Sequence, residues 1–319
     1  MSLTVTKAGV LTTFQDLGRA GFAAQGINPN GAMDVLSARL VNILLGNPEN
    51  RAVLEMHFPA PELKFNQNAL IAIEGADFSP SLDGAAISNG RPIPVKSGQI
   101  LGFKKKLRGN RCYLAIKGGF KIEKWLESAS TNLRAGIGGF KGRALRNGDL
   151  IVFGRECAEE SGAATFFLSP FFSPLLFQNE KIRIIPGPEF EELTALSESL
   201  FLKEEFTVGL ESDRMGYRLS GPGLFLLDEL ELVSAAAAFG TVQLLPDGQL
   251  IILMADHQTT GGYPRIGNVI SADLPRLAQF GPKDRIKFET VSVQEAENLK
   301  IKMESDLNLL KFGLRERGF

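Results

Sequence analysis

Cysteine and histidine are scarce in this chain of 319 residues, which contains two of each. Cys112 and Cys157 stand far apart and show no CxxC spacing, so we expect neither a disulfide framework nor a cysteine zinc site. Two histidines, His57 and His257, are too few for an HExxH motif or a multi-histidine metal centre. The sequence therefore predicts a reduced protein with no metal site.

An excess of basic charge and long apolar runs are also missing. Lys and Arg total 35 against 36 Asp and Glu, so there is no basic field to bind phosphate backbones. No apolar run approaches the ~20 residues that span a bilayer. The start, MSLTVTKAGVLTTFQ, lacks the pattern of a signal peptide. We expect a cytoplasmic protein with no nucleic-acid and no membrane partner.

Common nucleotide and cofactor motifs are absent from the sequence as well. No P-loop and no G-x-S-x-G elbow occur, and no Ala-Met-Lys-Met string marks a biotin carrier. The glycines of GIGGFKG (136–142) have the wrong offsets for a dinucleotide fingerprint. We therefore expect no covalently bound cofactor.

Glycine and proline are abundant, with 34 and 16 copies, which favours many short strands joined by tight turns. Three segments have helical apolar spacing, at 33–45, 188–205 and 292–311. Short β-rich segments bounded by turn residues lie at 69–78, 98–104, 111–119, 148–154, 181–187, 241–248, 249–256 and 284–293. The sequence predicts a mainly β protein with a few helices.

The chain length and one stretch of unusual composition predict two domains. Residues 155–180 combine small and polar residues with two Ser-Pro steps and five phenylalanines. We expect a first β-barrel-like domain over 1–155, a connection over 156–180, and a second such domain over 181–319 that ends in a helix. The phenylalanines predict that the connection packs on a protein surface.

Polar side chains gather beside glycines in five separate strings, and these side chains are the candidate site residues. They are Gln15, Asp16 and Arg19 in TFQDLGRAG; Asp34 in NPNGAMD; Ser130, Thr131 and Arg134 in LESASTNLRAGIGG; Asp213, Arg214 and Tyr217 in ESDRMGYRLSGPG; and Gln258, Thr259, Thr260 and Tyr263 in ADHQTTGGYPRIG.

Each string has a structural and a functional interpretation. Asp beside Gly is typical of turns, and an acidic side chain at the start of a helix stabilises the helix through its dipole. Alternatively, arginines bind carboxylate or phosphate groups, and carboxylates in a cleft activate water or move protons. In the functional interpretation Asp16, Asp34 or Asp213 handles water or protons. Arg214 then faces a cleft and binds an anion, with Asp213 or a backbone carbonyl orienting it.

Taken in order, these strings resemble the allophanate hydrolase subunit 2 family, also described as biotin-dependent carboxyltransferase-like proteins. The matching strings are TFQDLGRAGFAAQGINPNGAMD, ASTNLRAGIGGFKGRAL, SDRMGYRLSGP and LMADHQTTGGYPRIGNVISADLPRLAQ. They run from residue 13 to residue 279. The family includes a subunit of bacterial ATP-dependent 5-oxoprolinase, an antagonist of a sporulation kinase inhibitor, and the carboxyltransferase region of urea carboxylase.

The resemblance implies two cyclophilin-like β-barrel domains and work in a complex. The implied partners are an inhibitor-like subunit, similar to allophanate hydrolase subunit 1, and a TIM-barrel-like subunit that completes 5-oxoprolinase. The implied reaction opens 5-oxo-L-proline to L-glutamate, with ATP as co-substrate of the complex. Two alternatives stay open: a regulatory protein that binds a kinase inhibitor, and a carboxyltransferase that uses biotin carried on another chain.

The chain departs from the family pattern in two places. SAAAAFG (234–240) stands where relatives often carry an acidic, proline-containing turn, so any role of an acid there is missing. His257 stands where many relatives carry arginine, and it would hold an anion only when protonated.

Overall fold

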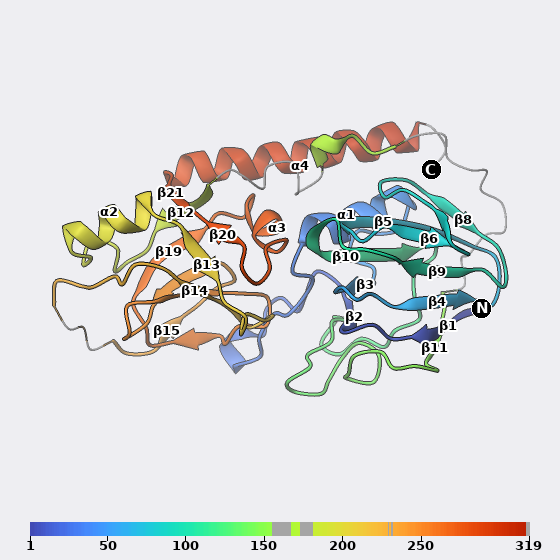
Figure 1. Ribbon diagram of the computed structural model, residues 1–319, viewed down its shortest axis with the longest axis horizontal. Coiled ribbons are helices and arrows are strands. Elements are labelled where there is room, and N and C mark those ends of the chain that lie inside the picture. Colours follow the sequence, from blue (N-terminus) through green and yellow to red (C-terminus); the bar gives the residue numbers. More distant parts are fainter. Residues whose placement is uncertain (155–166, 173–180, 229, 231, 317–319) are drawn as a thin grey trace. The chain divides into compact units, whose positions relative to one another are not determined.

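The computed structural model describes residues 1–154, 167–172, 181–228, 230 and 232–316 (Figure 1). The chain divides into two compact units that exchange short segments. Unit 1 comprises Met1–Arg19, Asn30–Leu176 and Leu309–Phe319, and unit 2 comprises Ala20–Pro29 and Phe177–Asn308. The units differ from the expected domains in two segments: residues 20–29 belong to unit 2, and the chain end belongs to unit 1. Most of the connection, with its predicted surface packing, lies outside the described residues.

Unit 1 contains two sheets that enclose one hydrophobic core. The first sheet has the order β11 (Leu150–Val152), β1 (Ser2–Lys7), β4 (Glu62–Phe65), β9 (Ile100–Phe103), β6 (Pro80–Leu82) and β7 (Ala85–Ala86). The second has the order β2 (Thr12–Gln15), β3 (Val53–Met56), β10 (Arg108–Ile116), β5 (Ala69–Asp77) and β8 (Ile93–Val95). Apolar residues from both sheets, such as Val5, Phe65, Ile73 and Leu114, form the core between them.

Helix α1 (Val35–Leu44) covers the other face of the five-stranded sheet. Val41 and Leu44 pack with Leu70 and Ala72 of β5, which alternate along the strand with the core residues Ile71 and Ile73. The helix begins after the fully buried Asp34, whose carboxylate accepts the backbone N–H of Ser37 at 2.9 Å. The predicted helix at 33–45 is confirmed, and its sheet is buried on both faces.

Unit 2 is built on one eight-stranded sheet. Its order is β20 (Arg285–Ile286), β13 (Phe206–Val208), β14 (Gly216–Ser220), β17 (Leu250–Leu253), β16 (Thr241–Leu244), β19 (Arg265–Val269), β12 (Ile182–Pro186) and β21 (Phe288–Thr290). The two edge strands, β20 and β21, are separated in the chain by Lys287 alone, so the two edges of the sheet come together. The sheet is a nearly closed barrel, and the expected mainly β architecture is confirmed.

The remaining elements of the chain are short strands, helical turns and two longer helices. Strand β15 (Ala235–Ala236) pairs with β18 (Thr260–Gly261) in a separate ribbon. The short helices are η1 (Ala23–Gln25), η2 (Pro170–Phe172) and α3 (Leu274–Leu277), and the longer ones are α2 (Ala195–Lys203) and α4 (Val293–Arg315). No helix in the described ranges is long and apolar enough to cross a membrane.

The predicted helix at 188–205 is wrong in its first third. The helix begins after Thr194, whose hydroxyl accepts the backbone N–H of Ser197 at 3.2 Å. Glu189, expected in the first helical turn, instead forms an ion pair with Arg265 on β19, with Nη2 and Oε1 2.9 Å apart. A long-range charge pair and a local cap thus override the helical pattern of the sequence.

Candidate functional site

Asp16 lies at the centre of a buried polar cluster in unit 1. Its carboxylate accepts hydrogen bonds from the hydroxyls of Ser128 and Ser130, at 2.7 and 2.6 Å. It also accepts the backbone N–H groups of Gly18 and Ala129, at 2.9 and 2.6 Å. Two strings more than a hundred residues apart therefore meet, and Asp16 is 4 % exposed and surrounded by donors. This environment assigns it a structural role rather than the predicted proton transfer.

Arg19 and Thr131 complete the same cluster. The Arg19 guanidinium donates to Oδ1 of Asn30 at 2.6 Å and to the carbonyl of Ser130, and it stacks over the Trp125 ring at 5.0 Å. The Thr131 hydroxyl donates to the carbonyl of Phe14 at 3.0 Å. These side chains hold strand β2 against the 128–131 segment.

Two further predicted residues lie beside this cluster without forming a pocket. Nε2 of Gln15 donates to the hydroxyl of Thr13 at 3.0 Å, and its Oε1 is buried without a partner in the described structure. Arg134 is exposed on the loop that follows.

Three predicted residues of unit 2 have structural contacts that correct the functional interpretation. Oδ1 of Asp213 accepts the backbone N–H of Met215 at 2.7 Å and closes a turn. Arg214 is oriented by Asp256 and not by Asp213: Nε and Nη2 donate to the two carboxylate oxygens at 3.0 and 2.8 Å, and the guanidinium is buried. The Tyr217 hydroxyl donates to the carbonyl of Phe280 at 3.0 Å inside the core.

The ADHQTTGGYPRIG stretch does form the wall of a pocket, with a volume of about 720 Å³. Gln258, Thr260 and Tyr263 line it, as the sequence predicts, and Thr259 is not among the lining residues. Thr259 instead accepts the backbone N–H of Ala237 through its carbonyl, at 3.0 Å. This contact and the β15–β18 pairing place SAAAAFG directly against the loop.

The opposite wall is one face of the eight-stranded sheet. Arg218 of β14 and Gln243 of β16 both lie opposite Ile251 of β17 in the strand register, so the three side chains form a row across neighbouring strands. The adjacent residues Tyr217 and Ile252 point into the core, because side chains alternate along a strand.

Gln243 is the most informative residue of this row. The residue is 3 % exposed, yet its Nε2 has no hydrogen-bond partner in the described parts of the chain. A Cβ at Gly261 would lie 2.6 Å from this nitrogen, so only glycine lets the loop approach the amide this closely. A buried donor without a partner costs about 1–3 kcal/mol unless a ligand or water accepts from it.

Sequence reasoning missed Arg218 and Gln243, although a signal for Arg218 was present. In GYRLS the apolar Tyr217 and Leu219 flank Arg218, and this alternation places the arginine on the opposite face from the core. The TVQL string of β16 is buried throughout, so its pattern gives no comparable sign for Gln243.

His257 lies next to the pocket loop but is not equipped to hold an anion near neutral pH. Burial lowers the pKa of His257, and its Nδ1 lies 2.6 Å from the carbonyl oxygen of Gln258. The neutral ring donates this hydrogen bond and fixes the start of the loop.

The pocket combines groups suited to a small polar ligand with one negative charge. Arg218 is more than half exposed, and its ion pair with Glu211 in the described part of the chain spans 4.0 Å, so its planar guanidinium is accessible to a carboxylate. Gln243 adds a buried amide whose Nε2 has no partner in the described structure, and Gln258 and Thr260 add neutral polar groups. No cluster of potential metal ligands occurs among the residues that the structure describes.

The mainly β fold in two units and the glycine-flanked polar strings are typical of a known class of protein. The chain belongs to the carboxyltransferase domain family, subdomains A and B, whose model matches residues 25–290. The resemblance inferred from the sequence is thereby confirmed.

Among its relatives are two proteins named as the C subunit of 5-oxoprolinase. The protein from Haemophilus influenzae is 42% identical over 301 residues, which cover 94% of each chain. The protein from Escherichia coli is 39% identical and covers 92% of this chain and 93% of the relative. The crystal structure of the Kluyveromyces lactis urea carboxylase superposes with a TM-score of 0.88 at 29% identity, over 97% of this chain and 29% of that one.

Proposed function

We propose that this chain is a subunit of an ATP-dependent 5-oxoprolinase, in which the unit 2 pocket binds 5-oxo-L-proline. Two relatives similar over nearly their full length are named as a 5-oxoprolinase subunit, which supports the reaction. The observation that carries the binding site is the buried, unpartnered Nε2 of Gln243 beside the accessible Arg218.

The pocket offers a complementary group for each polar part of this substrate. The Arg218 guanidinium pairs with the ring carboxylate, and Nε2 of Gln243 donates to the lactam carbonyl. Polarising that carbonyl makes the ring amide more electrophilic, which assists opening at the expense of ATP. The sequence contains no recognisable nucleotide motif, so ATP is a co-substrate of the complex rather than an assigned ligand of this chain.

We further propose that the chain works with two companions. The relatives are named as one subunit of an enzyme, and such a name implies that the enzyme has other subunits. The resemblance supports an inhibitor-like subunit, similar to allophanate hydrolase subunit 1, and a TIM-barrel-like subunit. The regulatory and biotin-dependent alternatives have no specific feature in the pocket that favours them.

The substitution Gln243→Met tests the pocket assignment, because it keeps the side-chain length and removes the donor. In the reconstituted complex we expect KM for 5-oxoproline to rise about two- to tenfold, the range for one neutral hydrogen bond. The thermal stability should be unchanged or increased, since an unpartnered buried donor is lost. Gln294→Met on the exposed face of α4 is the matched control. Unaltered kinetics in Gln243→Met would overturn the assignment.

A further inference from the structure

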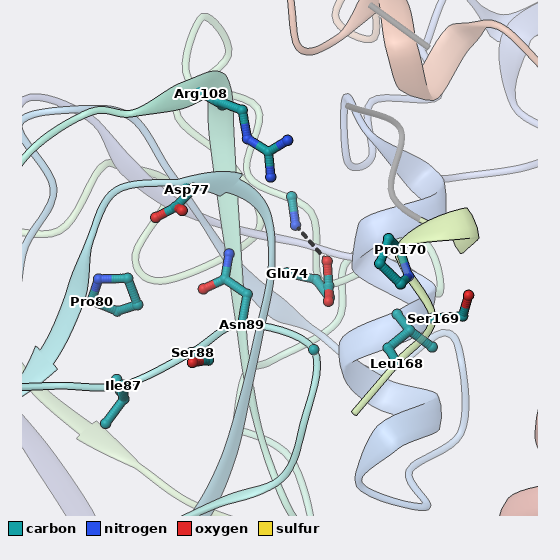
Figure 2. A pocket seen from close by; sticks show the side chains of 12 residues that line it. Glu74, Asp77, Pro80, Ile87, Ser88, Asn89, Arg108, Leu168, Ser169 and Pro170 are labelled. Carbon is teal, nitrogen blue, oxygen red and sulfur yellow. Dashed lines mark hydrogen bonds between the residues drawn. The ribbon is translucent and has the colours of Figure 1, made fainter. Parts of the chain in front are cut away.

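Unit 1 contains a separate polar cavity that the proposed function does not use. It has a volume of about 280 Å³, at the small end for ligand sites. Glu74 and Asp77 on β5, Asn89 on the 87–90 loop, and Arg108 on β10 line it (Figure 2). Figure 2 shows these four side chains arranged around one space, with residues 168–170 along one side.

Glu74 is a buried carboxyl without a cation. It is 6 % exposed, and its Oε2 accepts the backbone N–H of Gly75 at 3.2 Å. No ion pair to Glu74 occurs among the residues that the structure describes. A Cβ at Gly90 would lie 3.0 Å from Oε1, so glycine there keeps the space beside the carboxyl open.

Asn89 presents a second acceptor without a partner. Its Nδ2 donates to the carbonyl of Ala76 at 3.3 Å, which turns the amide oxygen toward the other side of the loop. That oxygen, Oδ1, is buried and has no hydrogen-bond partner within the described ranges. Asp77 contributes a carboxylate that accepts the backbone N–H of Ser79 at 2.9 Å. Two carboxylates, those of Glu74 and Asp77, therefore line the cavity, and the amide oxygen of Asn89 is turned away from Glu74 (Figure 2).

Arg108 adds a positive charge to the lining of the cavity. It lies opposite Asp77 in the register of β10 and β5, and its side chain is exposed at the cavity. It forms no ion pair within 4 Å in the described structure, so its guanidinium is available to a ligand carboxylate. The cavity thus combines an accessible arginine with a buried carboxyl that has no ion pair among the described residues.

We propose that this cavity binds a small α-amino acid as its zwitterion. The ligand ammonium binds the Glu74 carboxylate, and the ligand carboxylate pairs with Arg108. An ammonium group provides the cation that the buried Glu74 carboxylate lacks in the described structure, and charge-assisted hydrogen bonds are about twice as strong as neutral ones. A lactam such as 5-oxoproline has no ammonium, so the site distinguishes an open amino acid from the cyclic amide.

The ionisation of Glu74 is consistent with this arrangement. Burial raises the pKa of Glu74 to about 7, and the charge of Asp34 at the start of α1 adds to the effect. Asp77 and Arg108 are the other charged groups at the cavity, and Cys112 and Tyr113 lie on the neighbouring strand β10. A bound ammonium favours the carboxylate, so below pH 7 binding displaces the Glu74 proton to the buffer.

Calorimetric titration of the full chain with L-glutamate, at pH 6.5 in two buffers of different ionisation enthalpy, tests this inference. Neither ATP nor companion subunits are present, so the result is independent of turnover. We expect one binding site per chain and proton release. Binding of glutarate, which lacks an ammonium, should be at least tenfold weaker.

Variants separate the cavity from other binding. Glu74→Gln and Arg108→Gln should each weaken L-glutamate binding tenfold or more, and Glu74→Gln should abolish the proton release. Arg108 is exposed, so its variant keeps the fold, and Glu123→Gln on the surface of unit 1 is the control that should bind normally. Three outcomes would overturn the proposal: no binding of L-glutamate at millimolar concentration, equal binding of glutarate, or unchanged binding by both cavity variants.

Discussion

At the scale of single residues, Glu74 makes stability depend on pH. Its pKa of about 7 in the folded chain exceeds its ordinary value of 4.5. The folded chain therefore binds more protons than the unfolded chain between these values, and raising the pH through this window destabilises it. The difference corresponds to up to about 3 kcal/mol above pH 7.

We predict that Glu74→Gln is more stable than the parent chain at pH 8 and nearly equal to it at pH 4.5. The glutamine stays neutral, so it avoids the cost of a buried charge. Urea unfolding between pH 4.5 and 8, without amino acids, measures the difference. Parallel stability curves for the two chains would contradict the raised pKa.

Arg214 is a residue whose role the structure changed from ligand binding to packing. Its guanidinium donates one hydrogen bond to each carboxylate oxygen of Asp256, and lysine cannot make this paired contact. We predict that Arg214→Lys lowers the free energy of unfolding by about 2 kcal/mol, measured by thermal denaturation. Arg218→Lys, at an exposed residue whose contact with Glu211 spans 4.0 Å, should unfold at the parent temperature. Normal stability combined with lost 5-oxoproline binding in Arg214→Lys would restore the role predicted from the sequence.

At the scale of elements, the β15–β18 ribbon sets the depth of the unit 2 pocket. We predict that Gly261→Ala raises KM for 5-oxoproline about two- to tenfold, as Gln243→Met does, because the added Cβ displaces Nε2 of Gln243. Stability should change little, since the end of the glutamine side chain can move. Steady-state kinetics of the reconstituted complex measures the effect.

The matched control for this glycine is Gly102→Ala, a strand glycine of unit 1 whose nearest atom, in Glu62, is 3.8 Å from the added Cβ. Its kinetics should equal those of the parent chain. If Gly261→Ala also leaves KM unchanged, Gln243 does not contact the substrate.

At the scale of the whole molecule, we predict that the chain by itself does not convert 5-oxoproline to glutamate. The proposed reaction consumes ATP, and the sequence has no recognisable nucleotide motif. An assay with ATP and 5-oxoproline, with and without the companion subunits, decides the matter. Robust glutamate formation by this chain alone would show that it contains the complete site.

We also predict a stable complex with the inhibitor-like subunit. A specific interface buries about 1,200–2,000 Å² in total, and large apolar side chains such as Leu210, Phe225 and Val233 are exposed on unit 2. Co-expression followed by size-exclusion chromatography should give one co-eluting species. Separate elution at micromolar concentration would argue against the pairing.

The sequence by itself determined the local elements and the family. Helical spacing followed by Gly46-Asn47-Pro48 predicted α1, and short apolar runs between turn residues predicted strands such as β5, β10 and β17. These features follow from near neighbours in the chain, so local patterns are sufficient to find them. The loop with Gln258, Thr260 and Tyr263 was also found, because its polar residues stand together in one string.

Only the tertiary structure decided what the polar residues do. Asp16 is surrounded by donors because residues 128–130 fold back onto it. Arg214 pairs with Asp256, which stands 42 positions further along the chain and is brought to it by the fold. Conversely, Gln243 and Glu74 stand in ordinary-looking strands. Nothing near them in the sequence shows that Nε2 of Gln243 lacks a hydrogen-bond partner or that Glu74 lacks an ion pair among the described residues. Whether a buried polar group is satisfied depends on atoms brought together from distant segments, and local sequence patterns do not contain that information.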